Sequence, residues 1–574
     1  MNKRLFLGNE AVARGLYEAG VKVVSSYPGT PSTEITEYAA LYNEIDAEWA
    51  ANEKVAVEVA VGAAFSGVRA FSAMKHVGLN VAADPLFTVS YTGVNGGLVL
   101  GVADDPGMHS SQNEQDSRNY ANASKTLMIE PSDSSECKEF AKIAFSLSED
   151  FDTPVILRLT TRVSHSQSVV SENERTEAVV KPYQKDVMKY VMMPGMAKKR
   201  RVIIEERTNK LIEYAETSPL NRVEINDTKI GIITSGISYQ YAKEAFPNAS
   251  FLKLGVVWPL PKKLIEDFRG KVDTLYVIEE MDPYFENHIK TLGIPVLGKE
   301  VFSPYGEFST KSIREAITKE QAKPAYKDFN PPVRPPVLCP GCPHRGIYYV
   351  LSKLKLVVSG DIGCYTLGAL APLNSMDITI CMGSSVSGAH GISKGNPELS
   401  KRTVAVIGDS TFMHSGITGI ASTVYNKGTS TVLVLDNSIT GMTGHQQNPT
   451  TGYTLKGQPT IVANIEKIGE AVGYTRIKVV DPFNLDECEA VIKEEISADE
   501  PSLIIVRRPC VLLKSVKYDL DVNIDREACK NCKMCMKLGC PAISMVDGKP
   551  EINKTLCTNC GLCHNVCKFS AISV

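Results

Sequence analysis

The sequence lacks any long apolar run: nowhere in its 574 residues do the roughly 18 consecutive apolar residues of a membrane-spanning helix occur. It also lacks an excess of charge of one sign. Its 62 Lys and Arg against 65 Asp and Glu leave a net charge of −3, which argues against a nucleic-acid or anionic-membrane binder. Residues 1–20 lack the apolar core of a signal peptide and have the pattern of a short helix with a polar face. We therefore expect a cytoplasmic protein that binds neither membranes nor nucleic acid.

Cysteine, in contrast, is plentiful: the chain has 15, an odd number for its size. This count argues against a framework of disulfides and for a reducing compartment. The length of the chain predicts roughly three to five domains.

Helical and β-branched segments alternate along most of the chain, which is the pattern of parallel sheets flanked by helices, so we expect a multidomain α/β protein. Helix-like segments at 8–20, 53–66 and 134–148 separate strand-like runs such as "VRAFSAMK". A Pro-rich stretch at 323–337 predicts a linker. The predicted order is an α/β domain at 1–165, a charged helical connector at 166–228, a small α/β domain at 229–325, a third α/β domain at 338–515 and a Cys-rich tail at 521–574.

The tail contains two similar cysteine motifs, "CKNCKMCMKLGCP" and "CTNCGLCHNVCK". Three thiolates spaced i, i+3 and i+6 bind three corners of one [4Fe–4S] cubane, and in two-cluster ferredoxins the fourth ligand comes from the other motif. Structural zinc is the alternative, but zinc sites pair two C-x2-C knuckles rather than triple them. Lys568 replaces the usual proline after the last cysteine, and four residues rather than three precede Cys540, without loss of a ligand. The spacing assigns Cys529, Cys532, Cys535 and Cys567 to one cluster, and Cys557, Cys560, Cys563 and Cys540 to the other.

A diphosphate site is indicated where "RTVAVIGDSTFMHSG" runs a strand through Gly408, Asp409 and Ser410 into a helix. Glycine at such a turn lets backbone N–H groups approach a diphosphate. A second strand ends at Asn437 about thirty residues later, and oxygen atoms of Asp409, Asn437 and Ile439 would suit a hard divalent cation such as Mg²⁺. An Asp before Ser-Thr is equally often a simple helix cap. The paired strands resemble the pyrophosphate half of thiamine diphosphate enzymes, in which Gly441, Met442 and Thr443 would extend the cofactor loop.

The first domain, with "NEKVAVEVAVGAAFSGVRAFSAMKHVG", resembles the pyrimidine-binding domain of 2-oxoacid:ferredoxin oxidoreductases. The resemblance implies that Glu53 binds the aminopyrimidine of thiamine diphosphate; the alternative is a solvent-facing helix glutamate such as Glu58. "SSYPGTPST" is similar to the substrate loop of this family, so the resemblance implies that Thr30 binds the carboxylate of a 2-oxoacid. Lys75 and His76 are further candidates, for the substrate pocket or for an acid–base role. Arg118 in "HSSQNEQDSRNYA" is a candidate second ligand of the carboxylate, with an ordinary exposed loop arginine as the alternative.

"LCPGCPHRG" contains a C-x2-C pair that alone could be a redox pair, a zinc site or chance. The resemblance implies a third, proximal [4Fe–4S] cluster, whose four ligands would be Cys339, Cys342, Cys364 and Cys510. We expect the remaining cysteines, Cys137, Cys381 and Cys488, to be small buried apolar residues.

The order of these domains on one chain resembles the large subunit of indolepyruvate:ferredoxin oxidoreductases over nearly its whole length, with "MKHVGLNVAADPL" and "CPGCPHRG" as the most specific stretches. The resemblance implies oxidative decarboxylation of arylpyruvates (indolepyruvate, phenylpyruvate and 4-hydroxyphenylpyruvate). Coenzyme A would accept the acyl group, and electrons would pass singly through the clusters to ferredoxin. The resemblance also implies a separate small subunit and an α2β2 heterotetramer.

Three alternatives remain at this point. The same chemistry could act on an aliphatic 2-oxoacid, because nothing in the composition selects aryl substrates. An electron-transfer scaffold with a decayed thiamine site is less consistent with Glu53, Asp409 and Asn437 all being present. A non-oxidative decarboxylase would leave the cysteines of the tail without a purpose.

Overall fold

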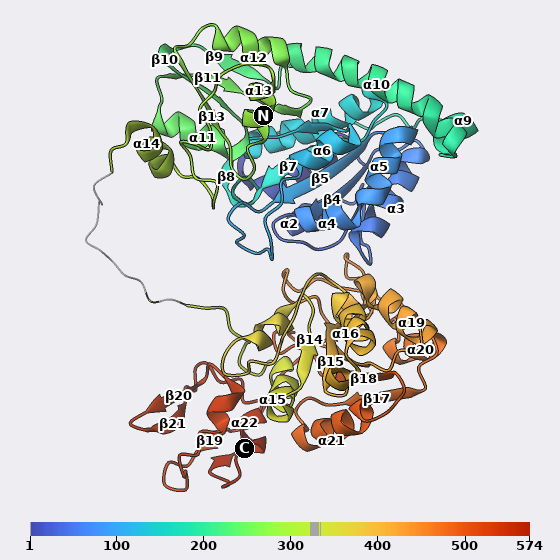
Figure 1. The fold of residues 1–574 in the computed structure, drawn as a ribbon, viewed down its shortest axis with the longest axis vertical. Coiled ribbons are helices and arrows are strands. Elements are labelled where there is room, and N and C mark those ends of the chain that lie inside the picture. Colours follow the sequence, from blue (N-terminus) through green and yellow to red (C-terminus); the bar gives the residue numbers. More distant parts are fainter. Residues whose placement is uncertain (1, 322–331, 333) are drawn as a thin grey trace. The chain divides into compact units, whose positions relative to one another are not determined.

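The computed structural model describes residues 2–321, 332 and 334–574. The chain forms two compact units, residues 1–329 and 330–574 (Figure 1). Most of the linker predicted at 323–337 lies outside the described residues. Among the described helices, none combines the length and the apolar character needed to cross a membrane.

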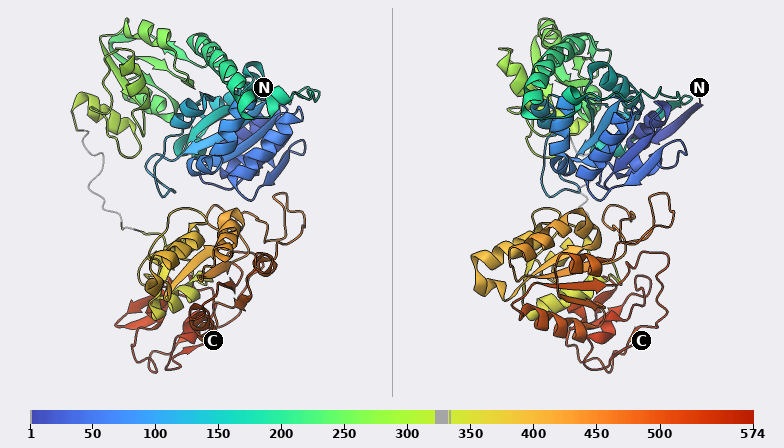
Figure 2. Two further views of the ribbon diagram at one scale, coloured as in Figure 1. Left: turned by 45° about the vertical axis from the view of Figure 1, so that its right-hand side comes forward. Right: turned by 90° about the vertical axis from the view of Figure 1, so that its right-hand side faces the viewer.

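The first unit is built around a seven-stranded sheet in the order β12-β6-β7-β5-β4-β2-β3, parallel except for β12 (Figures 1 and 2). Helices α1, α2 and α7 pack together on one face, and α3, α4 and α5 on the other. The strands are β2 (Val23–Ser26), β3 (Asp46–Trp49), β4 (Ala70–Lys75), β5 (Leu98–Asp104), β6 (Leu127–Ile129), β7 (Val155–Thr160) and β12 (Val256–Trp258), and the helices are α1 (Gly8–Glu18), α2 (Thr33–Ala39), α3 (Glu53–Phe65), α4 (His76–Val81), α5 (Ala83–Thr92), α6 (Arg118–Ser124), α7 (Ser134–Phe151) and α8 (Thr161–His165).

Two expectations for the first unit are corrected. Residues 2–7 form strand β1 (Asn2–Leu7) rather than the start of a helix, and this strand pairs with β8 (Gln167–Glu172). The connector expected to be helical therefore begins with a strand, and only then continues with α9 (Val187–Tyr190) and the long helix α10 (Pro194–Thr217). Pairing over such a sequence distance leaves no local signal in either segment.

A second, four-stranded sheet in the first unit has the order β13-β10-β11-β9. The run "FLKLGVVW" is divided between the two sheets, because β11 belongs to this sheet while β12 pairs with β6. A boundary at residue 228 thus does not separate the two sheets. The elements are β9 (Arg222–Glu224), β10 (Asp227–Thr234), α11 (Gly236–Ala245), β11 (Ala249–Lys253), α12 (Lys262–Arg269), β13 (Thr274–Ile278), α13 (Tyr284–Thr291) and α14 (Thr310–Thr318).

The second unit contains a five-stranded parallel sheet in the order β14-β15-β16-β18-β17. Its central strands β15, β16 and β18 consist mostly of buried β-branched and aliphatic residues, as expected for a parallel sheet covered on both faces, whereas the edge strand β17 is largely not buried. The elements are α15 (His344–Leu354), β14 (Val357–Ser359), α16 (Ser384–Gly395), α17 (Pro397–Ser400), β15 (Thr403–Gly408), α18 (Asp409–Thr411), a π-helical turn (Phe412–Gly416), α19 (Ile417–Tyr425), β16 (Thr431–Asp436), α20 (Ile465–Ala471), β17 (Arg476–Val480), α21 (Leu485–Ile496) and β18 (Ser502–Arg507).

The Cys-rich tail packs directly onto this sheet domain (Figure 2). Leu538, Ile543 and Leu562 of the tail belong to the same apolar core as Ile347 and Tyr348 of α15. The tail is therefore a fixed part of the second unit and not a module on a flexible tether. It consists of the paired strands β19 (Asn523–Ile524) and β22 (Ile572–Ser573), the hairpin β20 (Ile543–Val546) and β21 (Lys549–Ile552), a 3-10 helix (Cys535–Leu538) and α22 (Leu562–Asn565).

Candidate active site and redox centres

In the first unit, four adjacent parallel strands end at one edge of the sheet, in the order β5-β4-β2-β3. The loop after β2 carries Thr30, β3 leads to Glu53, β4 ends at Lys75 before His76, and β5 leads into the loop that includes Ser110. Ligands of open α/β sheets bind at this carboxyl edge. The topology thus brings four of the five predicted catalytic residues to one edge.

Glu53 is the first residue of α3, and the Asn52 side chain caps this helix by accepting a hydrogen bond from the backbone N–H of Val55. Glu53 is only 5% exposed, although its type is rarely buried. Glu58, one turn further along, is exposed and forms a surface ion pair with Lys54. Glu53 therefore has the burial expected of a functional group, whereas Glu58 has the exposure expected of an ordinary surface residue of a helix.

Lys75 and Thr30 are joined through Ser110: the Lys75 ammonium donates to the Ser110 carbonyl at 2.6 Å, and the Ser110 hydroxyl donates to the Thr30 carbonyl at 3.3 Å. Burial lowers the pKa of Lys75 to about 8, against the opposing charge of Asp105. Burial, with the charge of Lys75, also lowers the pKa of His76 to about 4. This edge therefore holds a neutral imidazole next to an ammonium group that loses its proton near pH 8.

His76 has one ring nitrogen near the Asn113 carbonyl, with 3.2 Å between Nε2 and O, while its buried Nδ1 makes no well-aligned hydrogen bond to the described residues. Leaving a buried polar atom without a hydrogen bond lowers the stability of a protein, unless a bound ligand supplies the partner. The residues at this edge therefore fit a bound polar ligand.

Arg118 does not lie in an exposed loop, and its expected role is corrected. It is the first residue of α6 and is 1% exposed. Its guanidinium forms ion pairs with Asp116 at 2.5 Å and Glu279 at 2.6 Å, and it packs over the rings of Tyr284 and Phe285. Because these groups occupy its donors and its faces, Arg118 joins the two sheets of the first unit and is not free to bind a substrate carboxylate.

In the second unit, strands β14, β15, β16 and β18 also end at one edge, which carries Cys364, Asp409, Asn437 and Cys510 on the loops that follow them. Burial raises the pKa of Asp409 to about 7, and Asp436 adds to this effect. A buried carboxylate of this kind is stabilised by a cation.

The side-chain amide of Asn437 lies beside this carboxylate and the carbonyl of Ile439. In one orientation of the amide, its oxygen lies 3.2 Å from Oδ1 of Asp409 and 2.8 Å from the carbonyl oxygen of Ile439; in the other, its nitrogen takes that position and donates to both. Three acceptors this close repel one another unless a cation lies between them or the amide rotates to donate. In an octahedral Mg²⁺ site, with oxygens at about 2.1 Å from the metal, neighbouring ligands are about 3 Å apart. With the amide oxygen of Asn437 in this position, the three predicted ligands have the chemistry and spacing of part of a Mg²⁺ site.

His344 is a site residue that the sequence did not reveal. It is buried, and its Nε2 lies 3.4 Å from the side-chain nitrogen of Asn437. Burial lowers the pKa of His344 to about 4, so that the neutral ring can accept from this amide. In the amide orientation that makes this contact, the oxygen of Asn437 faces Asp409 and Ile439. Its only sequence signal was its place directly after the cysteine motif "CPGCP".

The predicted cofactor loops pack closely around this edge. A Cβ atom on Gly408 would lie 2.6 Å from the ring of Tyr365, which explains why glycine ends β15. Ser410 is buried, and its backbone N–H donates to Asp409 at 2.8 Å. The other loop residues follow β16: Gly441, Met442, which is half exposed, and Thr443, whose hydroxyl donates to Gln446.

The four cysteines of the predicted proximal cluster, here called the proximal set, surround the same edge. A Cβ atom on Gly441 would lie 3.4 Å from Sγ of Cys364, and the N–H of Cys510 donates to the Asn437 carbonyl at 2.9 Å. Burial raises the pKa of Cys342 to about 12, and the neighbouring thiols of Cys339 and Cys364 contribute to this rise. The redox candidates and the cation candidates thus share one loop cluster.

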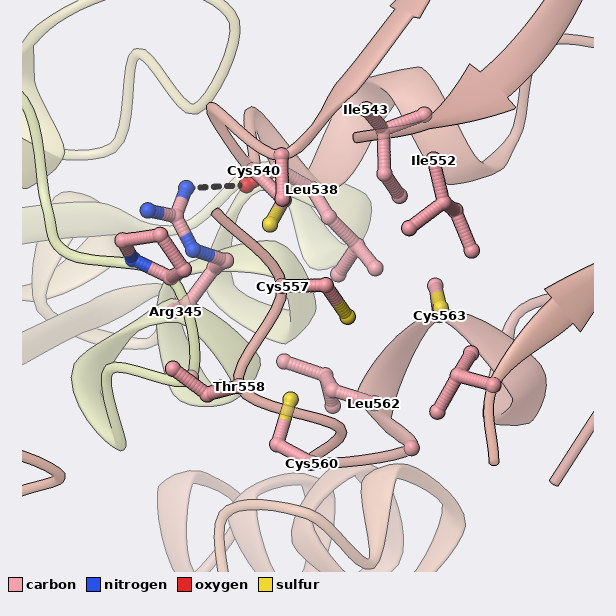
Figure 3. Close-up of a pocket in the computed structure, with 15 residues that line it drawn as sticks. Arg345, Leu538, Cys540, Ile543, Ile552, Cys557, Thr558, Cys560, Leu562 and Cys563 are labelled. Atoms are coloured by element: carbon pink, nitrogen blue, oxygen red, sulfur yellow. Dashed lines mark hydrogen bonds between the residues drawn. The ribbon is translucent and has the colours of Figure 1, made fainter. Parts of the chain in front are cut away.

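The tail cysteines line two separate cavities. One contains Cys540, Cys557, Cys560 and Cys563, here called the inner set, together with Gly341 and Arg345 (Figure 3). The other contains Cys529, Cys532, Cys535 and Cys567, the outer set. These are the two groups that the spacing predicts. Within the described part of the chain, no three His, Cys, Asp or Glu residues converge as ligands of a single metal ion, so these thiols surround spaces and do not meet at a point.

The three cysteines outside the predicted clusters differ in burial. Cys137 and Cys488 are fully buried, as expected, but Cys381 is exposed, so the expectation of a buried side chain is wrong for Cys381.

Comparison with known proteins matches three families: "Pyruvate flavodoxin/ferredoxin oxidoreductase, thiamine diP-bdg" at residues 14–225, "Thiamine pyrophosphate enzyme, C-terminal TPP binding domain" at 361–506, and "4Fe-4S binding domain" at 550–573. Indolepyruvate oxidoreductase subunit IorA of Archaeoglobus fulgidus is 40% identical over 99% of this chain and 97% of its own length. IorA of Pyrococcus horikoshii is 37% identical over 99% of this chain and 96% of its own length. These matches confirm the α/β fold class and the family resemblance, and they imply thiamine diphosphate and iron–sulfur cofactors. The chain belongs to the family of IorA subunits of indolepyruvate oxidoreductase.

Proposed function

We propose that this chain is the catalytic subunit that oxidatively decarboxylates arylpyruvates to aryl-acetyl-CoA and CO2 with reduction of ferredoxin. The substrates would be indolepyruvate, phenylpyruvate and 4-hydroxyphenylpyruvate, as the names of its relatives suggest. One observation carries the proposal: the backbone N–H of Cys510 donates to the carbonyl of Asn437, so that a predicted cluster ligand and a predicted cation ligand are joined directly. A non-oxidative decarboxylase has no use for a redox centre at this position.

Thiamine diphosphate, when bound, supplies the nucleophile that removes CO2 from a 2-oxoacid. In the second unit, Asp409, Asn437 and Ile439 would hold Mg²⁺ on its diphosphate, and the backbone after Gly408 would approach the phosphate oxygens. In the first unit, Glu53 would hold a proton against a ring nitrogen of the pyrimidine, because its carboxyl group is buried and helix α3 fixes its position.

The substrate pocket would lie at the carboxyl edge of the first sheet. Thr30 would bind the carboxylate of the 2-oxoacid, with Lys75 supplying a positive charge nearby. His76, whose pKa burial lowers to about 4, is neutral at physiological pH and would donate or accept one hydrogen bond without adding charge.

Three [4Fe–4S] clusters, one each on the proximal, inner and outer sets, would carry single electrons from the active site to a soluble ferredoxin. The shared core of the tail and the sheet domain supports this relay, because it fixes the spacing between the three sets. A separate small subunit would complete an α2β2 heterotetramer, coenzyme A would accept the acyl group, and the assembly would be cytoplasmic. The same chemistry on an aliphatic 2-oxoacid is the second candidate, since no described contact selects an aryl side chain.

The decisive test is anaerobic purification with the small subunit, followed by coenzyme A-dependent dye reduction with a panel of 2-oxoacids. Faster turnover with arylpyruvates is expected, and equal rates with pyruvate would contradict the aryl assignment. Glu53→Ala should abolish turnover and leave the cluster spectra unchanged, whereas Glu58→Ala, at an exposed position on the same helix, should be active. If Glu53→Ala also lost the clusters, Glu53 would be a structural residue.

A further inference from the structure

Arg345 is a buried cation between two of the proposed cluster sites. It is the second residue of α15 and is only 2% exposed. On one side it donates to the carbonyls of Leu338 and Cys339, next to the proximal set, and on the other its Nη1 donates to the carbonyl of Leu538 at 2.7 Å, in the tail. One guanidinium thus links the loops of the proximal and inner sets.

The positive charge of Arg345 has no carboxylate partner among the described residues. Among the described residues its hydrogen-bond acceptors are backbone carbonyls, and its buried Nε has no hydrogen-bond partner. Arg508, only two residues from Cys510, shows the usual arrangement, since it forms an ion pair with Asp481 at 2.6 Å. Burying an uncompensated charge is expensive, so a native protein places an anion beside it.

Cysteines of two different sets lie beside this charge, and as thiolates of bound clusters they would supply that anion. Arg345 lines the same cavity as the inner set, as Figure 3 shows. Its hydrogen bond to the carbonyl of Cys339, at 3.0 Å, places it beside the proximal set as well. The positive charge of Arg345 therefore lies next to both the inner and the proximal set.

We propose that Arg345 is a shared electrostatic partner of the proximal and inner clusters, and that it raises the reduction potential of both. This inference rests on the cluster assignments of the proposed function. Each one-electron reduction adds one negative charge to a cluster that four thiolates already make anionic, and no proton or bond is exchanged. A buried cation beside two such clusters stabilises the reduced form of each, and so favours transfer of an electron from the substrate that is being oxidised onto this pair of clusters.

The test is a redox titration of the intact complex, purified anaerobically and followed by EPR at each cluster. In Arg345→Gln, which keeps N–H donors for the carbonyls but removes the charge, the potentials of the proximal and inner clusters should fall while that of the outer cluster stays constant. Arg345→Lys should restore most of the shift. The matched control is the double variant Arg508→Met with Asp481→Asn, which removes a neutral ion pair without changing the net charge, and it should leave all three potentials close to wild type.

Two readouts separate the possible failures. Unchanged proximal and inner potentials in Arg345→Gln, with iron content intact, would overturn the role of Arg345. If Arg345→Gln and Arg345→Lys lost clusters equally, the residue would hold the loops through its shape and not through its charge, which also overturns the proposal. Zinc or no iron in the wild-type protein would instead refute the cluster assignment itself, and metal analysis detects this independently of any potential.

Discussion

The side chain of Glu53 fills the space that a Cβ atom on residue 78 would need: such an atom would lie 2.6 Å from Oε1 and 2.7 Å from Cγ of Glu53. Gly78 lies in the helix that begins at His76, so two predicted site residues and this glycine form one packed group. The glycine holds the carboxyl group in its place by leaving room for it.

Replacing Gly78 with Ala should therefore displace Glu53 and lower turnover by more than about tenfold, because misplacing a catalytic group by an ångström is costly. Gly62→Ala is the matched control: it lies in α3, the helix of Glu53, and a Cβ atom there meets nothing within 4 Å. Steady-state oxidation of a 2-oxoacid and the cluster spectra would be measured for both variants. Equal activity of the two would show that the position of Glu53 is not critical.

Asn437→Ala should abolish Mg²⁺-dependent binding of thiamine diphosphate, because it removes one of three converging oxygens. Calorimetric titration with thiamine diphosphate, with and without Mg²⁺, measures this directly. Asn426→Ala, at the exposed end of α19, is the control and should bind the cofactor normally. Retained binding in Asn437→Ala would place the cation elsewhere.

Cysteine substitutions can test the crossed pairing of the two tail motifs. Cys540→Ser should remove the inner cluster and leave the outer one, although Cys540 belongs to the same motif as three ligands of the outer set. Cys567→Ser should do the reverse. Iron analysis and EPR would distinguish the two, with Cys488→Ser, a buried cysteine in α21 away from both cavities, as the control. Loss of the outer cluster in Cys540→Ser would refute the crossed assignment.

Glu280 should make the first unit less stable as the pH rises. Burial raises its folded-state pKa from 4.5 to about 7, although it accepts a hydrogen bond from the N–H of Phe308 and feels the charge of Arg158. Because the folded state holds the proton of Glu280 more tightly than the unfolded state does, protonated Glu280 favours folding. This contribution to the free energy of unfolding is fully present below pH 4.5 and is lost as the pH rises to about 7. Glu280→Gln should therefore stabilise the protein at pH 8, by at most about 3 kcal/mol, and much less at pH 5. Denaturant unfolding at both values checks this.

Glu300→Gln is the control for this pH effect, since Glu300 is an exposed glutamate of the same sheet domain. It should change stability by the same small amount at both pH values. A similar pH-independent result for Glu280→Gln would contradict a buried titration.

Local patterns in the sequence predicted the elements that local forces determine. The helices expected at 8–20, 53–66 and 134–148 are confirmed as α1, α3 and α7, because each has an apolar face or a capping residue within its own segment. The strand ends that carry Asp409 and Asn437 were also predictable, since parallel strands with turn residues after them have a clear signal.

Features that depend on distant partners were not predictable. Strand β1 was taken for a helix because its pairing partner is β8. The role of Arg118 was misjudged because its partner Glu279 lies far along the chain. The split of "FLKLGVVW" depends on Gly255, where a Cβ atom would lie 2.3 Å from the carbonyl oxygen of Leu220. In each case the decisive contact is absent from the local sequence.

Strand β12 borders β6 at the edge of the seven-stranded sheet, while the strands before and after it in the chain complete the four-stranded one. The polypeptide thus passes from the four-stranded sheet to the seven-stranded sheet and back again. As a result, neither sheet can finish folding before the other is in place, and the first unit should unfold in one cooperative transition. A fragment that ended before Val256 would leave the border of β6 open, with backbone groups free to recruit another molecule into an aggregate.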